Sequence, residues 1–297
     1  MIKKKIVFII LHYMAVETTF ECIKHIMDNI DTDSYQIVVV DNNSPDDSYD
    51  LLYNKYQKER SVDLIHCEEN LGFSRGNNLG IRYARQKYET EFLVVMNNDA
   101  FMLETLFLKK VEMYYGQYHF SVAGPRVVDK YGVSSNPVAD DLPSIDIINK
   151  RVAHHEKMLR LNRLHLMMIY YRYKNLRMRL ERCNKIIRNR EKKKINENEV
   201  KQDVVLHGCF WIFSNDFFRE YEGLTEKKAL FAEEETLLYM LRQKHLVSIF
   251  LPDILVIHME DASTNAAYKE LKKRLLFISK NQIETWKEYV EMMGENE

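Results

Sequence analysis

Short polar stretches that combine acids with amides follow directly after apolar runs of this sequence. "DNNS" begins at Asp41, after "YQIVVV", and "NND" begins at Asn97, after "EFLVVM". Carboxylate and amide oxygens suit hard divalent cations such as Mg²⁺ and Mn²⁺, which also accept phosphate oxygens. Asn97 and Asp99 alternate at the end of a run, and alternate side chains of a strand point to one side. Each stretch alone is more typical of an ordinary polar turn, so its chemistry depends on its place in the fold.

Two common phosphate-binding loops are absent from the sequence. A dinucleotide site would place GxGxxG after the first apolar run, where "LHYMAVETT" stands without a glycine. The sequence also has no P-loop. If this protein binds phosphate, another group must neutralise its charge, and a divalent cation near Asp99 is the candidate.

Apolar runs and amphipathic periods alternate through the first hundred residues. Apolar runs at 5–11, 35–40, 62–67 and 91–96 predict buried strands, with helices between them at 18–30, 49–57 and 75–88. This alternation favours an α/β fold with a mainly parallel sheet and helices on both faces. Ligands of such sheets bind beyond the carboxyl ends of the strands. The polar stretches that begin at His12, Asp41, Glu68 and Asn97 all lie there.

The composition is that of a globular protein from a reducing compartment. The 297 residues are 46% hydrophobic and 29% charged, with a formal net charge of −1. No apolar stretch reaches the roughly 18 residues that span a bilayer. The start, "MIKKKIVFIIL", lacks the cleavage site of a signal peptide and is interpreted as a strand.

The four cysteines stand far apart in the sequence. Their spacing fits neither a zinc cluster nor a disulfide framework and predicts a cytoplasmic location. Of these, Cys209 is interpreted as a core residue.

One segment is strongly basic. Residues 150–194 hold sixteen lysines or arginines against three glutamates, and glycine and proline are absent from 144 to 207. Leucine, methionine, isoleucine and tyrosine recur there at near-helical spacing, which predicts an amphipathic helical insertion. It is either a solvated helix that packs on its own protein or a peripheral anchor on an anionic membrane surface. A nucleic-acid site ranks last because no nucleic-acid motif accompanies the charge, so we expect no nucleic acid partner.

Seven motifs follow one another in a fixed order along the sequence: "VVVDNNSPDDS", "ENLGFSRGNNLGIRYA", "FLVVMNNDAFM", "GPRVVDKYG", "HGCFWIFSNDFF", "LFAEEETLLYMLR" and "VIHMEDAST". In this order they resemble the inverting family 2 glycosyltransferases of the GT-A fold, particularly their bacterial rhamnosyl- and hexosyltransferase-like branch. The resemblance covers nearly the whole chain except roughly residues 140–202.

The resemblance implies a role for each matching residue. Asp41 would hydrogen-bond the nucleotide base and Tyr13 would line it. The expected nucleotide-sugar contacts continue through Asn43, Asn70, Gly72, Arg75, Asn78, Asn97 and Asn98. Asp99 and His258 would hold Mn²⁺ or Mg²⁺ with the diphosphate. Glu233 and Glu234 match an acidic pair at a helix start whose second member is the catalytic base, although the register of Glu233, Glu234 and Glu235 stays open.

The implied activity is transfer of a sugar from a nucleotide-diphosphate donor, a UDP-sugar or a dTDP-rhamnose-like sugar, to a glycan or lipid-linked acceptor. The alternative is a catalytically weak relative that binds nucleotide sugars or glycans. We expect a GT-A domain at 1–265, interrupted by the basic helical insertion at about 140–202, and a C-terminal helical segment at 266–297. Surface polysaccharide synthesis at the inner face of the cell membrane is the expected setting.

Overall fold

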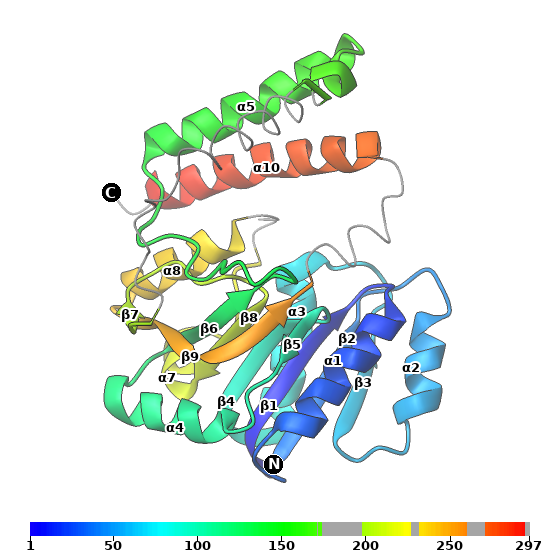
Figure 1. Cartoon of the computed structure of the whole chain (residues 1–297), viewed down its shortest axis with the longest axis vertical. Coiled ribbons are helices and arrows are strands. Elements are labelled where there is room, and N and C mark those ends of the chain that lie inside the picture. The colour runs from blue at the N-terminus through cyan, green and yellow to red at the C-terminus, as the bar shows by residue number, and fades with distance from the viewer. Residues whose placement is uncertain (171, 174–197, 227–231, 260–270, 295–297) are drawn as a thin grey trace. The chain divides into compact units, whose positions relative to one another are not determined.

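The computed structural model describes residues 1–170, 172–173, 198–226, 232–259 and 271–294. The chain forms two compact units: one comprises Met1–Leu142 and Val200–Ala267, and the other Pro143–Glu199 and Tyr268–Glu297 (Figure 1). The predicted boundary at 265 and the basic residues from 174 to 194 lie outside the described residues.

The first half of the central sheet consists of four parallel strands. These are β1 (Ile2–His12), β2 (Tyr35–Asp41), β3 (Val62–His66) and β4 (Tyr88–Asn97), which lie in the order β3-β2-β1-β4. β2 and the later parts of β1 and β4 are continuously apolar and buried, whereas the edge strand β3 is mostly half-buried. The predicted strands and their parallel arrangement are confirmed, and their carboxyl ends share one edge of the sheet.

The second half of the sheet mixes strand directions. β8 (Phe210–Ser214) runs antiparallel between β4 and β6 (Val122–Val128), and β9 (Ser248–His258) is parallel to β6. Two short strands, β5 (Ala100–Met102) and β7 (Lys201–Gln202), pair antiparallel with β9. Among the described strands, β1, β2, β3, β4, β6 and β9 run in one direction, so the sheet is mainly parallel, as predicted.

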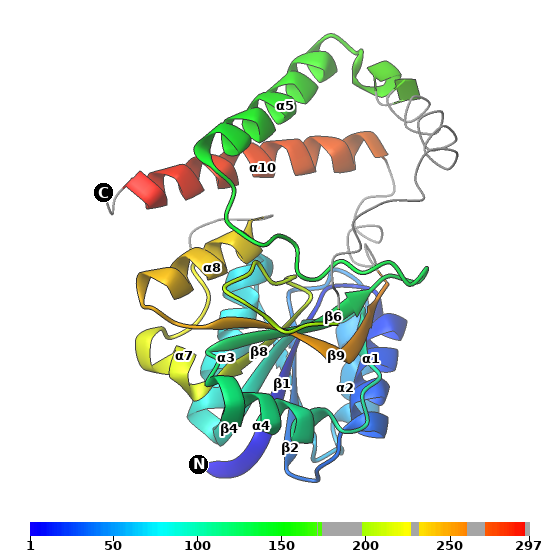
Figure 2. The same ribbon diagram turned by 60° about the vertical axis from the view of Figure 1, so that its left-hand side comes forward.

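Helices cover both faces of this sheet. α1 (Val16–Asn29), α2 (Ser48–Tyr56) and α4 (Phe107–Tyr118) pack on one face, and α3 (Gly72–Lys87), α7 (Asn215–Glu220) and α8 (Glu233–Gln243) on the other (Figure 2). Successive side chains of β1 point to opposite faces of the sheet, so Phe8 packs in the core under the first group of helices and Ile9 in the core under the second. Such a fully buried side chain contributes roughly 1.5–3 kcal/mol.

Glycines in α3 let this helix approach the sheet closely. Gly72 begins the helix with a φ of +75°, a conformation that favours glycine. A Cβ atom at Gly80 would lie 2.6 Å from Ile9 Cγ2, so a larger residue there would push α3 away from β1. The close packing fixes the loop that precedes α3 at the carboxyl edge of the sheet.

The second unit pairs two helices, α5 (Ile145–Arg163) and α10 (Leu271–Gly294). The guanidinium of Arg151 lies 4.5 Å from the ring centroid of Trp286, and Ile148, Met158 and Tyr289 are buried. The described part of the expected helical insertion is helical through α5, which ends at Arg163, and His165 follows with a φ of +57°. None of the helices within the described part of the chain has the length and apolarity needed to cross a bilayer.

Candidate active site

Three strand ends bring a buried acid between two histidines. Asp41 of β2 is in register with His12 of β1 and His66 of β3. The Asp41 side chain is 1% exposed, and its carboxylate lies 2.7 Å from His66 Nδ1 and accepts the Ser44 amide hydrogen. His12 is fully buried with its nitrogens 2.7 Å from Thr19 Oγ1 and 3.0 Å from Ser48 Oγ. Burial lowers the pKa of His12, more than the nearby Asp41 carboxylate raises it, which disfavours the charged form of this ring.

Asn42, the residue after Asp41, ties two loops of the site together. Its side-chain amide donates to Asn70 Oδ1 at 3.1 Å, and its oxygen accepts the Leu71 amide hydrogen at 2.8 Å. Asn70 Oδ1 also accepts the Gly72 amide hydrogen. The loop after β2 is thereby fixed to the loop before α3. The sequence analysis predicted only nucleotide contacts for Asn70 and Gly72 and not this structural link.

Four of the predicted nucleotide contacts are accessible at this end of the sheet. Tyr13 and Asn43 are partly exposed, and Asn70 and Arg75 are exposed. Asn43 has a φ of +59°, which suits asparagine in a tight turn. Arg75 Nε donates to the Leu71 carbonyl, which directs its side chain back along the start of α3. These residues are placed where a ligand beyond the sheet edge can reach them.

Asn78 is engaged differently from its predicted role. Its buried side chain donates to the Leu224 carbonyl at 2.8 Å and accepts the Leu224 amide hydrogen at 2.7 Å. Both ends of the amide are therefore used to hold the loop around Leu224 against α3. The geometry gives Asn78 a positioning function.

The "NND" stretch forms a turn rather than a continued strand. β4 ends at Asn97, and Asn98 and Asp99 turn the chain into β5, so strand alternation does not place Asp99. Asn98 donates to Thr19 Oγ1, toward α1. Asp99 is 5% exposed, and its Oδ1 lies 3.2 Å from His258 Nε2 because β5 pairs Ala100 with His258.

The side chains of the three glutamates at the start of α8 lie in different environments. Glu234 Oε1 accepts the Gly208 amide hydrogen at 3.1 Å and interacts electrostatically with His258. Glu233 lines a small pocket with Ser74 and Thr236, and Glu235 is buried. Burial raises the pKa of Glu234, while its backbone hydrogen bonds and its electrostatic interaction with His258 lower it less. Glu234 therefore brings a carboxylate of increased basicity to the Asp99–His258 pair.

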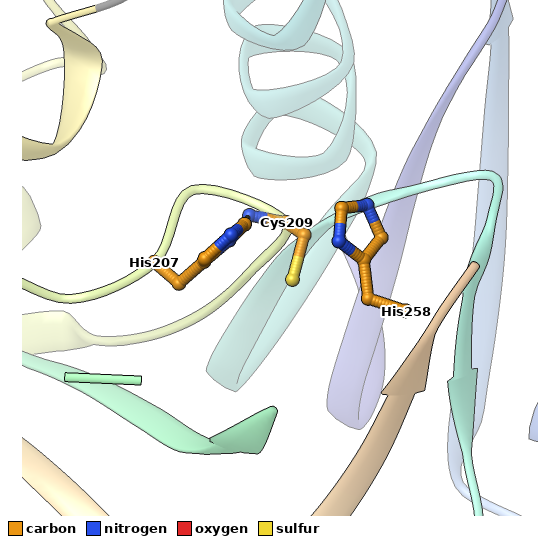
Figure 3. Close-up of side chains that lie close together, drawn as sticks. All are labelled: His207, Cys209 and His258. Carbon is orange, nitrogen blue, oxygen red and sulfur yellow. Dashed lines mark hydrogen bonds between the residues drawn. The ribbon is translucent and has the colours of Figure 1, made fainter. Parts of the chain in front are cut away.

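Two further residues complete this cluster, and sequence reasoning missed both. His207 and Cys209 lie beside His258, and one ligand atom from each of the three lies within 4.8 Å of the others (Figure 3). The rings of His207 and His258 have centroids 5.3 Å apart. Cys209 is buried, as predicted for a core residue, but the cysteine spacing on which the sequence analysis relied does not register the two histidines beside its thiol. The "HGC" stretch directly before an apolar strand was the available signal.

The chain resembles several solved structures along most of its length. It superposes on residues 1–349 of S. aureus TarS with a TM-score of 0.51, 14% identity and coverage of 93% of this chain and 65% of that one. The UDP complex of the same protein gives a TM-score of 0.52 at the same identity and coverage. GalNAc-T7 with UDP, GalNAc and Mn²⁺ gives 0.54 at 13% identity, covering 86% of this chain and 43% of that one. This chain thus spans less than two thirds of the length of each.

These likenesses confirm the predicted GT-A fold. No curated protein matches the chain. The sequence profile described as glycosyl transferase family 2 matches residues 7–222, which include most of the sheet and end before α8 and β9. The chain therefore belongs to glycosyl transferase family 2.

Proposed function

We propose that this protein is an inverting glycosyltransferase that moves a sugar from a nucleotide-diphosphate donor to a glycan or lipid-linked glycan acceptor. The observation that carries the proposal is the position of Glu234. Its carboxylate is held by the Gly208 amide beside the Asp99–His258 pair, at the carboxyl edge of the sheet. Ligands of open α/β sheets bind at this edge.

Glu234 would act as the general base. Its oxygen takes the proton of an acceptor hydroxyl as that hydroxyl attacks the anomeric carbon from the face opposite the nucleotide. The C–O bond to the diphosphate breaks as the new glycosidic bond forms, so the configuration inverts in one displacement. A raised pKa strengthens Glu234 as a base at neutral pH.

The donor nucleotide would lie over the ends of β1, β2 and β3. Asp41 would recognise the base, Tyr13 and Asn43 would line it, and Asn70, Gly72 and Arg75 would border the ribose and phosphates. Since Asp41 is enclosed by His66 and the Ser44 amide, His66 joins the proposed base contacts. UDP-sugars and dTDP-rhamnose-like sugars are the proposed donors.

The residues present fit a divalent cation at the diphosphate. Asp99 offers a carboxylate oxygen and His258 an imidazole nitrogen, 3.2 Å apart and both almost fully buried. The carboxylate suits Mn²⁺ and Mg²⁺, whereas the imidazole favours the softer ion of the two. We therefore propose Mn²⁺ or Mg²⁺, held by Asp99 and His258. When bound, the cation would stabilise the negative charge of the leaving diphosphate.

A catalytically weak nucleotide-sugar or glycan-binding relative is the second candidate. The enclosure of Asp41 favours it, because this carboxylate must exchange protein hydrogen bonds for nucleotide contacts.

The first proposal also includes a biological setting. The glycan or lipid-linked acceptor would belong to surface polysaccharide synthesis at the cytoplasmic face of the membrane.

The test is a donor screen followed by the stereochemistry of turnover. UDP- and dTDP-sugars are added with and without Mn²⁺, and a bound donor raises the unfolding midpoint by mass action. The protein is then allowed to hydrolyse the best donor, and NMR identifies which anomer of the free sugar is released first. Inverted configuration supports the proposal, and retained configuration refutes it. Donor binding without turnover in the presence of Mn²⁺ favours the second candidate.

A further inference from the structure

His207, Cys209 and His258 gather potential metal ligands from two segments far apart in the sequence. His207 and Cys209 lie in the loop directly before β8, whereas His258 is the last residue of β9 (Figure 3). Two imidazole nitrogens and a thiol sulfur lie within 4.8 Å of one another. Cys209 is 1% exposed, but His207 is partly exposed and gives access to the cluster from the surface.

The two nitrogens of His258 have different surroundings. Nε2 faces the Asp99 carboxylate at 3.2 Å. Nδ1 is buried and finds no hydrogen-bond partner among the residues that the structure describes. In Figure 3 the ring turns this nitrogen toward Cys209. A buried nitrogen without a partner is costly, because its lost hydration is not replaced.

Asp99 and His258 resemble the arrangement that orients metal-binding histidines in proteins. Such a histidine commonly donates its other ring N–H to a carboxylate, which fixes the tautomer and raises the basicity of the ligand nitrogen. With its proton on Nε2 toward Asp99, His258 presents the Nδ1 lone pair to Cys209 and His207. The unpartnered nitrogen and the fixed tautomer point to the same ligand, a cation.

The donor set selects the kind of cation. Mg²⁺ prefers oxygen ligands, whereas two imidazoles and a thiolate suit Zn²⁺ and Co²⁺. Tetrahedral Zn²⁺ with ordinary bond lengths needs ligand atoms about 3.4–3.6 Å apart. The three ligand atoms lie within 4.8 Å of one another, so metal binding would require them to move together by about 1 Å. Three protein ligands would leave the fourth position open.

We propose that His207, Cys209 and His258 form a binding site for a thiophilic divalent cation such as Zn²⁺, with Asp99 as the positioning residue. The two cations would occupy alternative states of one ring: this site uses the lone pair of His258 Nδ1 with the proton on Nε2, whereas the proposed diphosphate cation needs the lone pair of Nε2. This site does not depend on the proposed function, because it rests on the ligand geometry alone.

The test uses Co²⁺ and Zn²⁺ as probes on the full chain after removal of bound metal with a chelator. Co²⁺ should give a thiolate-to-cobalt charge-transfer band in the near ultraviolet with one equivalent of metal. Competition with a chromophoric chelator measures Zn²⁺ affinity. Cys209→Ser should abolish the band, and Asp99→Asn should weaken Zn²⁺ binding by about 10- to 100-fold.

Cys67→Ser is the matched control, because Cys67 is also buried but lies outside the cluster. It should keep both the band and the affinity. Absence of a thiolate band in the unmodified protein refutes the site without any variant, as does a band that Cys209→Ser retains. Sugar transfer is measured separately with Mn²⁺, so a thiolate band in a protein without transferase activity supports this site and counts against the proposed function alone.

Discussion

His66 Nδ1 lies 2.7 Å from a carboxylate oxygen of Asp41, and the two residues end neighbouring strands in register. The side chain of Asp41 is 1% exposed, whereas that of His66 is 42% exposed. Tyr49 packs beside the histidine with 4.6 Å between ring centroids. A ligand approaching the sheet edge therefore meets His66 before it can reach the acid.

Asp41→Asn should weaken nucleotide binding by about tenfold to a hundredfold, which corresponds to the loss of one hydrogen bond to a charged group. Titration calorimetry with UDP and dTDP measures the change. Asp47→Asn is the control, since Asp47 lies in the same loop, is exposed and makes no side-chain cap to α2. Equal affinity in Asp41→Asn and the unmodified protein would remove Asp41 from the nucleotide site.

His66→Ala separates two modes of recognition. If the base contacts His66, this variant should lose as much affinity as Asp41→Asn. If the base displaces the histidine and contacts the acid itself, His66→Ala should bind with unchanged or higher affinity. The same calorimetric titration decides between them.

Glu234→Gln should lower turnover by roughly 10²- to 10⁴-fold while donor binding is retained, because glutamine keeps the shape and cannot accept the proton. Glu233→Gln and Glu235→Gln are the matched controls on the same helix turn, and both should keep most of the activity. A large loss in either control instead would assign the base to that residue. Unchanged turnover in all three would contradict base catalysis from α8.

The pH dependence of turnover should report the raised pKa of Glu234. A general base works only when deprotonated, so the rate should fall as the pH drops through this pKa. Because burial raises the pKa, the acid limb should lie above the ordinary glutamate value of about 4.3. The measurement is kcat against pH at saturating donor, and the residual rate of Glu234→Gln should lack this limb. An acid limb at or below the ordinary value contradicts the assignment.

Asn78→Ala should destabilise the fold, because it leaves the buried Leu224 amide and carbonyl without their partner. An unsatisfied buried polar group costs about 1–3 kcal/mol. Urea unfolding measures the loss, and Asn54→Ala on the exposed face of α2 should change stability little. A variant as stable as the unmodified protein would show that Asn78 does not hold this loop, and a loss of donor affinity alone would return Asn78 to the nucleotide site.

Periodicity was enough to predict the first half of the sheet. Continuous apolar runs need cover on both faces, and amphipathic periods need one covered face, so their alternation allows few arrangements. The polar strand ends at Asp41 and Asn97 then had to share an edge. The register between strands was not available from the pattern, and only the register places His12 and His66 on either side of Asp41.

The second half of the sheet explains what remained hidden. β8 inserts antiparallel between β4 and β6, and β5 turns back onto β9. These reversals bring Asp99 and the His207–Cys209 loop to His258, and no local pattern encodes such long-range pairing. The end of α5 before His165 is likewise a local feature that hydrophobic spacing does not reveal.

The basic segment keeps its two interpretations, and its described part favours the membrane. Leu164, Leu166, Ile169 and Tyr173 are exposed in a stretch that also holds exposed Arg163 and Arg172. Exposed apolar side chains among cations are typical of helices that lie in the interface of an anionic bilayer. Each Lys or Arg near such a surface contributes about 1 kcal/mol.

We therefore expect the protein to co-sediment with liposomes that contain anionic lipid at low salt, and to be released at high salt because the attraction is screened. Leu164→Ser combined with Ile169→Ser and Tyr173→Ser should abolish sedimentation without unfolding the protein, since all three side chains are exposed. The control carries Tyr131→Ser and Val133→Ser, two exposed apolar residues of the first unit, and should sediment normally. If the triple variant sediments as much as the control, the membrane interpretation is wrong. It is also wrong if the unmodified protein does not sediment at all, and the solvated helix is then the correct interpretation.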